Sequence, residues 1–329
     1  MKIKRKNRLK KLLAIQSKTY QTQRMSRYIC DELNRLNLPH TKDKYGNIYC
    51  AKGYAKYYPC MVCHIDTVHE IAKSPRIFEH EDIMVAFDMK TKQQIGTGGD
   101  DKVGIFITLE MLRHYNNFKA VFFLDEECGC VGSSHAQLSF FKDCTTVLEC
   151  DRRGYNDFVN SISGTKLFND KYYNVIKPIL KKYNRTVCNG GITDVGEILP
   201  KLPIMGANMS CGYYNPHSDT EYIHVSEVEQ TRLLCIDIFD KIQEPIKWGN
   251  NESRHNYNRF NFSNYQPKKI NATNVNRWNY YTDDFTTDAF DEDEATCPTC
   301  GKDCVQEYDE TVNEFWCYSC QEYVSNPKL

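Results

Sequence analysis

The stretch Ala120-Val121-Phe122-Phe123-Leu124-Asp125-Glu126-Glu127 decides the fold. Its five apolar residues end abruptly in carboxylates, and a Gly-containing turn follows, which predicts a buried strand. Three further apolar runs predict buried strands in the same way, at residues 57–65, 145–149 and 203–209. A shorter strand is predicted at 48–51, after a Gly-Asn break.

Helical periodicity separates these strands. It covers residues 8–37, 103–115, 171–183 and 228–242. Ser226 and Glu229 fit a capping box that opens the last of these helices. Strands that alternate with helices indicate an α/β domain with a largely parallel central sheet.

Composition and charge limit the class of protein. The chain has 329 residues, 41% of them hydrophobic and 26% charged, which indicates a globular protein with one large domain and a smaller unit, or two ordinary domains. The net charge of −1 favours neither nucleic acid nor an anionic membrane. A basic segment at 1–11 precedes an apolar run of only four residues, too short for a signal peptide or a membrane span. We therefore expect a cytoplasmic protein without a membrane partner.

Sixteen cysteines are many for such a chain. Because it is long and lacks an export signal, the eleven scattered cysteines are interpreted as reduced thiols that pack as small hydrophobic groups. Before the other five, the composition changes. Residues 246–294 are rich in polar and acidic residues, which predicts a flexible linker between a domain at 1–245 and a tail unit at 295–325.

The tail contains two Cys-x-x-Cys pairs, Cys297 with Cys300 and Cys317 with Cys320, separated by 16 residues. This spacing is typical of a zinc ribbon, in which four thiolates hold one structural Zn²⁺. Such modules bind nucleic acid, bind protein or cap a chain. The charged residues of this tail are mostly acidic, which makes nucleic acid an unlikely ligand and favours a protein partner.

Five polar clusters follow the predicted strands or begin the helices after them. They contain His64 with Asp66, Asp100 after a glycine-rich turn, Glu126 with Glu127, Asp151, and His217. Each alone fits an ordinary strand end, helix cap or solvated edge. Together they bring two imidazoles and several carboxylates to the carboxyl ends of one sheet, where open α/β folds place their sites. Such a set suits two Zn²⁺ ions around a shared carboxylate.

The same segments resemble a known family, the cocatalytic dizinc peptidases of the peptidase T, acetylornithine deacetylase and succinyl-diaminopimelate desuccinylase type. The resemblance runs from the first helix to about residue 242. The segments that carry it are, in chain order, His64-Ile65-Asp66-Thr67-Val68, Gly99-Asp100-Asp101-Lys102-Val103-Gly104, Asp125-Glu126-Glu127-Cys128-Gly129 with Gly132-Ser133, Asp151, Gly190-Gly191-Ile192-Thr193-Asp194, and Cys211-Gly212-Tyr213-Tyr214-Asn215-Pro216-His217-Ser218. It implies a three-layer exopeptidase-like domain with a mixed, mostly parallel sheet.

The resemblance also implies roles for individual residues. One metal is expected on His64, Asp100 and Asp151, and the other on Asp100, Glu127 and His217. Asp66 is expected to orient His64, and Glu126 to act as the general base. Zinc is the expected metal, although such ligands also accept Co²⁺ or Mn²⁺.

One departure from the family concerns the segment between Asp151 and His217. Only 65 residues separate them, whereas the family carries a separate lid domain there. The lid is therefore expected to be absent. Three functions stay open: an exopeptidase, such as an aminopeptidase, on short peptides; an N-acyl amino acid deacylase; or an inert adaptor that acts through the zinc ribbon. The intact general base disfavours the adaptor.

Overall fold

The structure, a computed structural model, describes residues 1–249 and the backbone of 295–296, 303–306, 314–317 and 322–325. The chain divides into two units, 1–260 and 261–329, each considered by itself. Within the described part, no helix has the length and apolar character needed to cross a bilayer. The predicted boundaries at 245 and 295 stay predictions.

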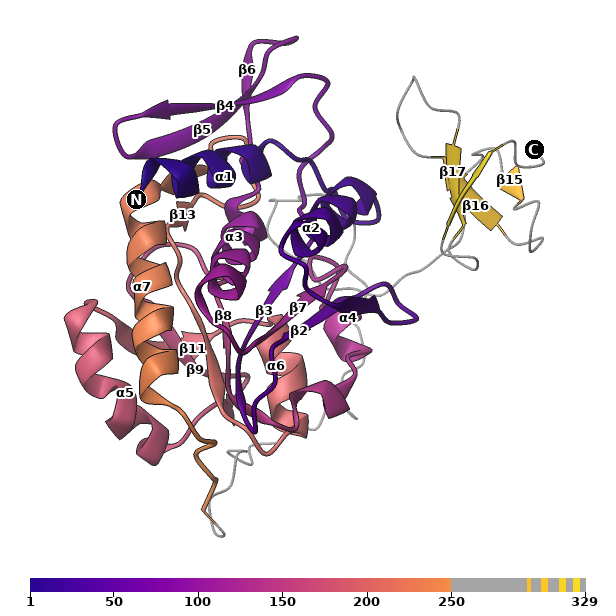
Figure 1. Ribbon diagram of the computed structural model, residues 1–329. Helices are drawn as coiled ribbons and strands as arrows, with labels where there is room; N and C mark the ends of the chain where they lie inside the picture. Colours follow the sequence, from indigo (N-terminus) through magenta and orange to yellow (C-terminus); the bar gives the residue numbers. More distant parts are fainter. Residues whose placement is uncertain (250–294, 297–302, 307–313, 318–321, 326–329) are drawn as a thin grey trace, which may run out of the picture. The chain divides into compact units, whose positions relative to one another are not determined.

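A nine-stranded sheet forms the centre of the first unit (Figure 1). Its strands, in spatial order, are β1 (His40–Lys42), β2 (Ile48–Lys52), β7 (Phe118–Phe123), β3 (Tyr58–His64), β8 (Cys144–Glu149), β12 (Gly206–Met209), β9 (Asp157–Ile162) and β10 (Thr165–Lys166), with β11 (Thr186–Gly190) also paired to β9. The neighbours β7, β3, β8 and β12 run parallel, and antiparallel strands flank them. The predicted mixed α/β sheet is confirmed.

The central strands are apolar because both of their faces are covered. Every residue of β7 and of β8 is buried, and β3 is buried at all but one position. Parallel strands covered by helices on both sides show this continuous apolar pattern. The three predicted strands at 57–65, 120–124 and 145–149 therefore agree closely with the observed ones.

Residues 1–249 of this unit contain seven helices: α1 (Ile3–Leu13), α2 (Gln23–Arg35), α3 (Gly99–His114), α4 (Val131–Ser134), α5 (Asp170–Lys182), α6 (Asp194–Ile198) and α7 (Val225–Lys241), with 3₁₀ turns at Leu138–Phe141 and Leu199–Lys201. Helix α3 packs on β3 and β7, and α1 and α7 pack against α3. Helix α6 packs on β3, β8 and β12, with α4 beside it. The result is the expected three-layer arrangement.

Two local predictions were wrong. The helical pattern over 8–37 is two helices, α1 and α2, interrupted at 14–22. Helix α7 begins at Val225 without a side-chain cap, so the capping box is not formed. Ser226 instead donates its backbone N–H and its hydroxyl to Asp82, and Glu229 pairs with Arg5 and Arg232. Asp82, Arg5 and Arg232 therefore bind the groups of Ser226 and Glu229 that a capping box would use.

A second sheet, not predicted from the sequence, is antiparallel. It consists of β13 (Tyr213–Tyr214), β14 (Tyr222–His224), β5 (Ile83–Asp88) and β4 (Pro75–His80), and β6 (Gln93–Ile95) pairs with β5. The β14–β5 pairing joins the segment after His217 to the segment before Asp100. It thereby brings together two loops that are remote in sequence.

The segment between Asp151 and His217 contains strands β9 to β13, together with α5 and α6. Apart from β13, its strands all belong to the central sheet. The eleven cysteines of the first unit are free thiols, in agreement with the prediction, and most are buried.

The tail contains four short antiparallel strands: β15 (Ala295–Thr296), β16 (Asp303–Gln306), β17 (Glu314–Cys317) and β18 (Glu322–Ser325). Cys297, Cys300 and Cys320 lie outside the described residues, and Cys317 is described by its backbone alone. The zinc ribbon and its metal therefore stay predictions.

Candidate metal centre

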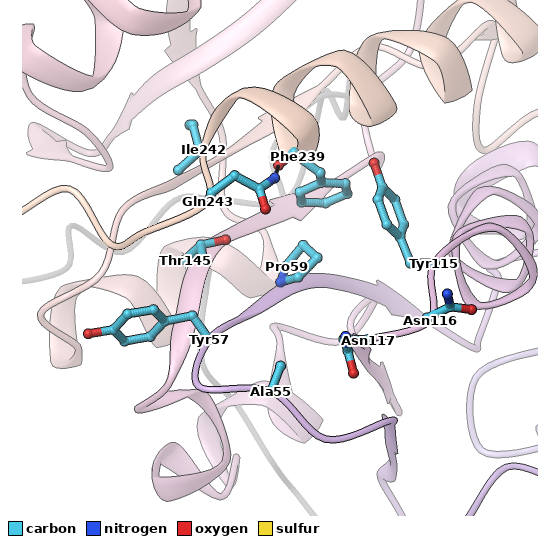
Figure 2. A pocket seen from close by; sticks show the side chains of 10 residues that line it. All are labelled: Ala55, Tyr57, Pro59, Tyr115, Asn116, Asn117, Thr145, Phe239, Ile242 and Gln243. Atoms are coloured by element: carbon cyan, nitrogen blue, oxygen red, sulfur yellow. Dashed lines mark hydrogen bonds between the residues drawn. The ribbon is translucent and has the colours of Figure 1, made fainter.

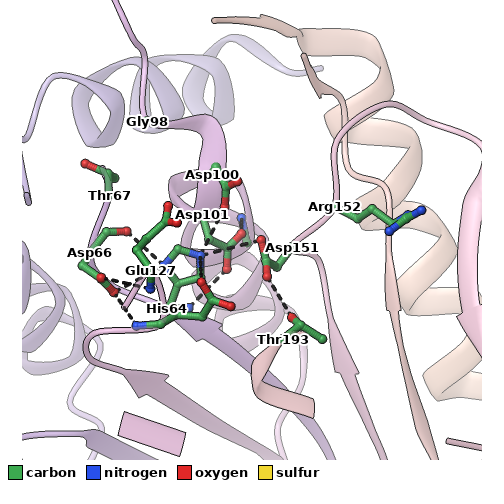
Figure 3. Close-up of polar contacts among 12 residues, drawn as sticks. His64, Asp66, Thr67, Gly98, Asp100, Asp101, Glu127, Asp151, Arg152 and Thr193 are labelled. Atoms are coloured by element: carbon green, nitrogen blue, oxygen red, sulfur yellow. Dashed lines mark hydrogen bonds and ion pairs between the residues drawn. The ribbon is translucent and has the colours of Figure 1, made fainter. Parts of the chain in front are cut away.

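The site forms where β3, β7 and β8 end side by side. In the parallel register His64 lies opposite Phe123, and Val62 lies opposite Glu149. The residues that follow these strands are therefore neighbours, and Asp100 at the start of α3 joins them (Figure 3). His217, from the loop after β13, completes the group. The structure brings together all seven residues that we predicted: His64, Asp66, Asp100, Glu126, Glu127, Asp151 and His217.

His64 is fully buried, and its Nε2 faces carboxylates. This nitrogen lies 3.2 Å from Oδ1 of Asp100, 3.6 Å from Oδ1 of Asp151 and 3.9 Å from Oε2 of Glu126. An imidazole nitrogen among oxygen donors at these separations is the kind of group that holds Zn²⁺ in proteins.

Asp100 lies between the two imidazoles. Its Oδ1 faces His64, and its Oδ2 lies 3.4 Å from Nε2 of His217. The same His217 nitrogen lies 3.1 Å from Oε2 of Glu127. One ligand atom each from His64, Asp100 and Glu127 fall within 4.8 Å of one another. A carboxylate with one oxygen toward each of two histidines has the position needed to bridge two cations.

Asp66 holds the turn that carries the two glutamates. Its carboxylate accepts hydrogen bonds from the Thr19 hydroxyl at 2.9 Å and from the backbone N–H groups of Glu126 at 3.0 Å and Glu127 at 3.3 Å. Nδ1 of His64 lies 3.0 Å from the backbone oxygen of Asp66 and 3.5 Å from its carboxylate. The carbonyl is thus the nearer acceptor for the imidazole, whereas the sequence analysis considered only the carboxylate.

Asp151 is held by three residues that were given no role from the sequence. Asn208 accepts the backbone N–H of Asp151 at 2.9 Å and donates to its carbonyl at 2.7 Å. The Thr193 hydroxyl lies 2.8 Å from Oδ2 of Asp151, and the Tyr213 hydroxyl donates to Oδ1 at 3.2 Å. Figure 3 shows Thr193 below Asp151 and Arg152 directed away from the cluster. Arg152 pairs with Asp157 instead.

Asp101 supports His64 from behind. Its carboxylate accepts the backbone N–H of His64 at 3.2 Å and that of Gly104 at 3.0 Å. The next residue, Lys102, donates to the carbonyl oxygens of Leu13 and Thr97. Asp101 therefore fixes a ligand, and Lys102 fixes the loop.

The centre contains far more acidic groups than basic ones. Eight carboxyl groups gather around two imidazoles: Asp66, Asp100, Asp101, Glu126, Glu127, Glu149, Asp151 and Asp194. Oε1 of Glu127, Oε1 of Glu149 and both carboxylate oxygens of Asp194 are buried without a hydrogen-bond partner. Crowded, desolvated carboxylates disfavour one another's ionisation unless a cation compensates for them.

The pKa values reflect this crowding. Burial, opposed by His64 and reinforced by Asp151 and Asp194, raises the pKa of Glu126 to about 9. Burial also raises the pKa of Asp151 to about 7, with a contribution from the charge of Asp100. Hydrogen bonds to Asp100 and Glu127 raise the pKa of His217 to about 10. The site thus favours positive charge at its centre. Its imidazole and carboxylate groups are donors that fit divalent cations, which would displace the protons on binding.

A cavity of about 340 Å³ lies elsewhere, at the amino ends of β3 and β8 (Figure 2). Its lining combines aromatic, amide and small side chains and carries no formal charge: Ala55, Tyr57, Pro59, Tyr115, Asn116, Asn117, Thr145, Phe239, Ile242 and Gln243. None of the predicted site residues takes part in it.

This chain is similar to known proteins in its structure, not detectably in its sequence. No family model matches the sequence. No curated protein matches it either.

Solved peptidase structures share the fold. Aminopeptidase PepT from Bacillus cereus superposes with a TM-score of 0.62 at 14% identity, over 73% of this chain and 98% of that one. A tripeptidase from Staphylococcus aureus gives 0.58 at 11% identity, over 71% and 96% of the two chains. An aminopeptidase from the archaeon Desulfurococcus kamchatkensis gives 0.57 at 13% identity, over 74% and 95%. The chain therefore has the fold of these peptidases.

Proposed function

We propose that the first unit is a metal-dependent peptidase that removes residues from the end of short peptides. The observation that carries this proposal is the position of Asp100, with one carboxylate oxygen toward His64 and the other toward His217. The likeness to solved aminopeptidases supports the reaction class.

The proposed metal ligands form two sets that share Asp100. His64, Asp100 and Asp151 would hold one cation, and Asp100, Glu127 and His217 the other. Zn²⁺ is the proposed metal, with Co²⁺ or Mn²⁺ as substitutes; bound cations would polarise the scissile carbonyl and lower the pKa of the attacking water. The buried acid excess described above is the physical reason for expecting them.

Glu126 is the proposed general base. Its Oε1 accepts a hydrogen bond from the Cys130 thiol at 3.3 Å, while Oε2 lies toward His64. In the metal-free protein burial raises the pKa of Glu126. Bound cations beside it would lower this pKa, so that the carboxylate could take a proton from water and then deliver it to the leaving amine. Asp66 supports this chemistry by holding the backbone N–H of Glu126 and, through its carbonyl, the His64 ring.

The rest of the chain enters the proposal in two ways. We propose that the unit works without a lid domain, so that its substrates are short peptides taken directly from solvent. His217, with about half of its side chain exposed, marks the open side. We also propose that residues 295–325 form a zinc ribbon on Cys297, Cys300, Cys317 and Cys320 that binds a protein partner.

Zinc counting combined with a substrate panel tests the proposal. We expect three zinc ions per metal-replete chain, and one in the His64→Ala/His217→Ala double variant. Aminoacyl p-nitroanilides and tripeptides should be hydrolysed by the wild type alone. Preferential cleavage of N-acetyl amino acids would instead indicate a deacylase. A single zinc per wild-type chain, with no hydrolysis, would contradict an enzymatic function and favour an adaptor.

A further inference from the structure

Glu221 is a buried carboxylate outside the proposed ligand set. It lies four residues after His217, directly before β14, and its side chain has no exposed surface. Its Oε2 accepts the backbone N–H of Gly98 at 2.5 Å and lies 2.9 Å from Nε2 of His69. Its Oε1 accepts the backbone N–H of Asp100 at 3.2 Å. One side chain therefore holds both ends of the turn that delivers Asp100.

The glycine-rich turn is shaped to fit this carboxylate. A Cβ added at Gly99 would lie 3.3 Å from Oε1 of Glu221 and 2.7 Å from Cβ of Tyr213. A Cβ at Gly96 would overlap the His69 ring. The turn thus approaches Glu221 and its partner His69 so closely that side chains are excluded on the facing side. This close contact explains why residues 96 and 99 are glycines.

The position of Asp100 depends on these contacts. Asp100 has non-helical backbone angles, so the hydrogen-bond ladder of α3 does not fix it. The next residue, Asp101, accepts the backbone N–H groups of His64 and Gly104. The backbone N–H of Asp100 itself donates to the carboxylate of Glu221. Because Glu221 and His217 share one short loop, a single segment supplies a proposed ligand and the anchor for the carboxylate between the two histidines.

We propose that Glu221 is a positioning residue for Asp100, and that His69 orients Glu221 for this task. The inference rests on the proposed function, because Asp100 is there the shared metal ligand. Glu221 itself touches neither substrate nor metal. Its carboxylate fixes the backbone of Asp100, so that both oxygens keep their directions toward His64 and His217. Without it the two metal sites should weaken together, since they share this one ligand.

Zinc affinity of the full-length protein measures this role. Zinc alone is titrated against a fluorescent chelator, with wild type, Glu221→Gln, Glu221→Ala and His69→Gln compared. The Glu227→Gln variant is the matched control, because Glu227 accepts only the Tyr214 hydroxyl near the same loop. Loss of a residue that supports a metal ligand typically weakens metal binding about 10–100-fold. We expect that loss for both catalytic zinc ions in Glu221→Ala.

The conservative variants make the test specific. Gln at 221 keeps one oxygen acceptor for a backbone N–H, so the loss of affinity should be smaller, and smaller again for His69→Gln. Excess zinc should restore kcat in Glu221→Gln, which a damaged fold would not allow. Should Glu221→Ala fail to fold, the Gln variants still decide the question. Wild-type zinc affinity in Glu221→Gln and His69→Gln would overturn the inference.

Failure of the underlying function gives a different result. In that event the wild type would bind no more zinc than the His64→Ala/His217→Ala variant, and both proposals would fall together. Wild-type binding at two additional sites, unchanged by every Glu221 variant, would leave the peptidase proposal intact and remove only the role of Glu221.

Discussion

The carboxyl and amino ends of β3, β7 and β8 carry different side chains. At the carboxyl ends, eight carboxyl groups surround two imidazoles, and several of their oxygens are buried without a hydrogen-bond partner. At the amino ends of β3 and β8, a cavity of about 340 Å³ is lined by residues without formal charge. The strands between these ends are uniformly buried. Stability alone does not account for the acidic end, because uncompensated buried charge opposes folding. The comparison therefore points to the carboxyl ends as the functional side.

The largest expected effect is at the acidic end. Glu126→Gln should lower kcat about 10²–10⁴-fold, because the amide cannot take a proton from water. The bound zinc should stay at the wild-type level. Hydrolysis of an aminoacyl p-nitroanilide, together with zinc analysis, measures both. Asp125→Asn is the control, since this neighbouring carboxylate accepts the Tyr45 hydroxyl instead of facing the centre. Near-wild-type turnover in Glu126→Gln would exclude the proposed base.

The next largest effect is expected at the amino ends of the strands. A substitution there should lower the free energy of unfolding without changing catalysis. Phe239, 1% exposed, packs edge-on against Phe118 with ring centroids 5.5 Å apart. Phe239→Ala should reduce the free energy of unfolding by about 3–5 kcal/mol through lost burial and an enlarged cavity. Urea denaturation measures the loss. A fall in kcat or zinc content per folded molecule would contradict the separation of the two ends.

A pH-dependent effect is expected from Asp194 in the metal-free protein. Burial raises its folded-state pKa from 3.8 to about 7. Between these values the folded protein binds a proton that the unfolded chain has released, so stability falls as the pH rises through this window. Asp194→Asn should therefore stabilise the chelated protein by up to about 4 kcal/mol near pH 8 and by much less near pH 4. Urea unfolding in EDTA at both pH values tests this. Identical pH dependence in variant and wild type would be inconsistent with a buried, raised-pKa carboxyl.

The smallest effect is again at the neutral end. Tyr57→Phe removes one hydroxyl from the cavity lining and should change the free energy of unfolding by less than about 0.5 kcal/mol. Zinc content and kcat should equal those of the wild type, as measured by the same assays. A substantial loss of activity would show that the amino ends of the strands also have a functional role, which would contradict the assignment of function to the carboxyl ends.

The sequence predicted the parts of the fold that leave a strong apolar signal. Strands β3, β7 and β8 were found because burial on both faces forces a continuous apolar run. The second sheet was missed because β13 and β14 are only two and three residues long, and because the apolar run at 83–87, which forms β5, was not interpreted as a strand. Short antiparallel strands of this kind depend on partners remote in the chain, which no local pattern reveals.

The candidate site, like the fold, was predicted from the sequence only in part. The proposed ligands were recognisable because histidine and carboxylates directly after apolar strands are unusual residues in unusual places. The roles of Thr193, Asn208, Tyr213 and Glu221 were not recognisable, because each is an ordinary polar residue whose importance comes from a partner far away in sequence. The carbonyl of Asp66 as the nearer acceptor for His64 also leaves no trace in the side-chain pattern.

The contact between Glu221 and the Gly98 turn has a consequence for the timing of assembly. The two residues lie 123 positions apart in the chain. Closing such a long loop costs entropy before any contact repays it, so this junction forms late in folding. During synthesis the ribosome must release the β13–β14 segment before His217 and Glu221 can reach Asp100. A nascent chain therefore carries most of the acidic cluster for some time without the loop that completes it.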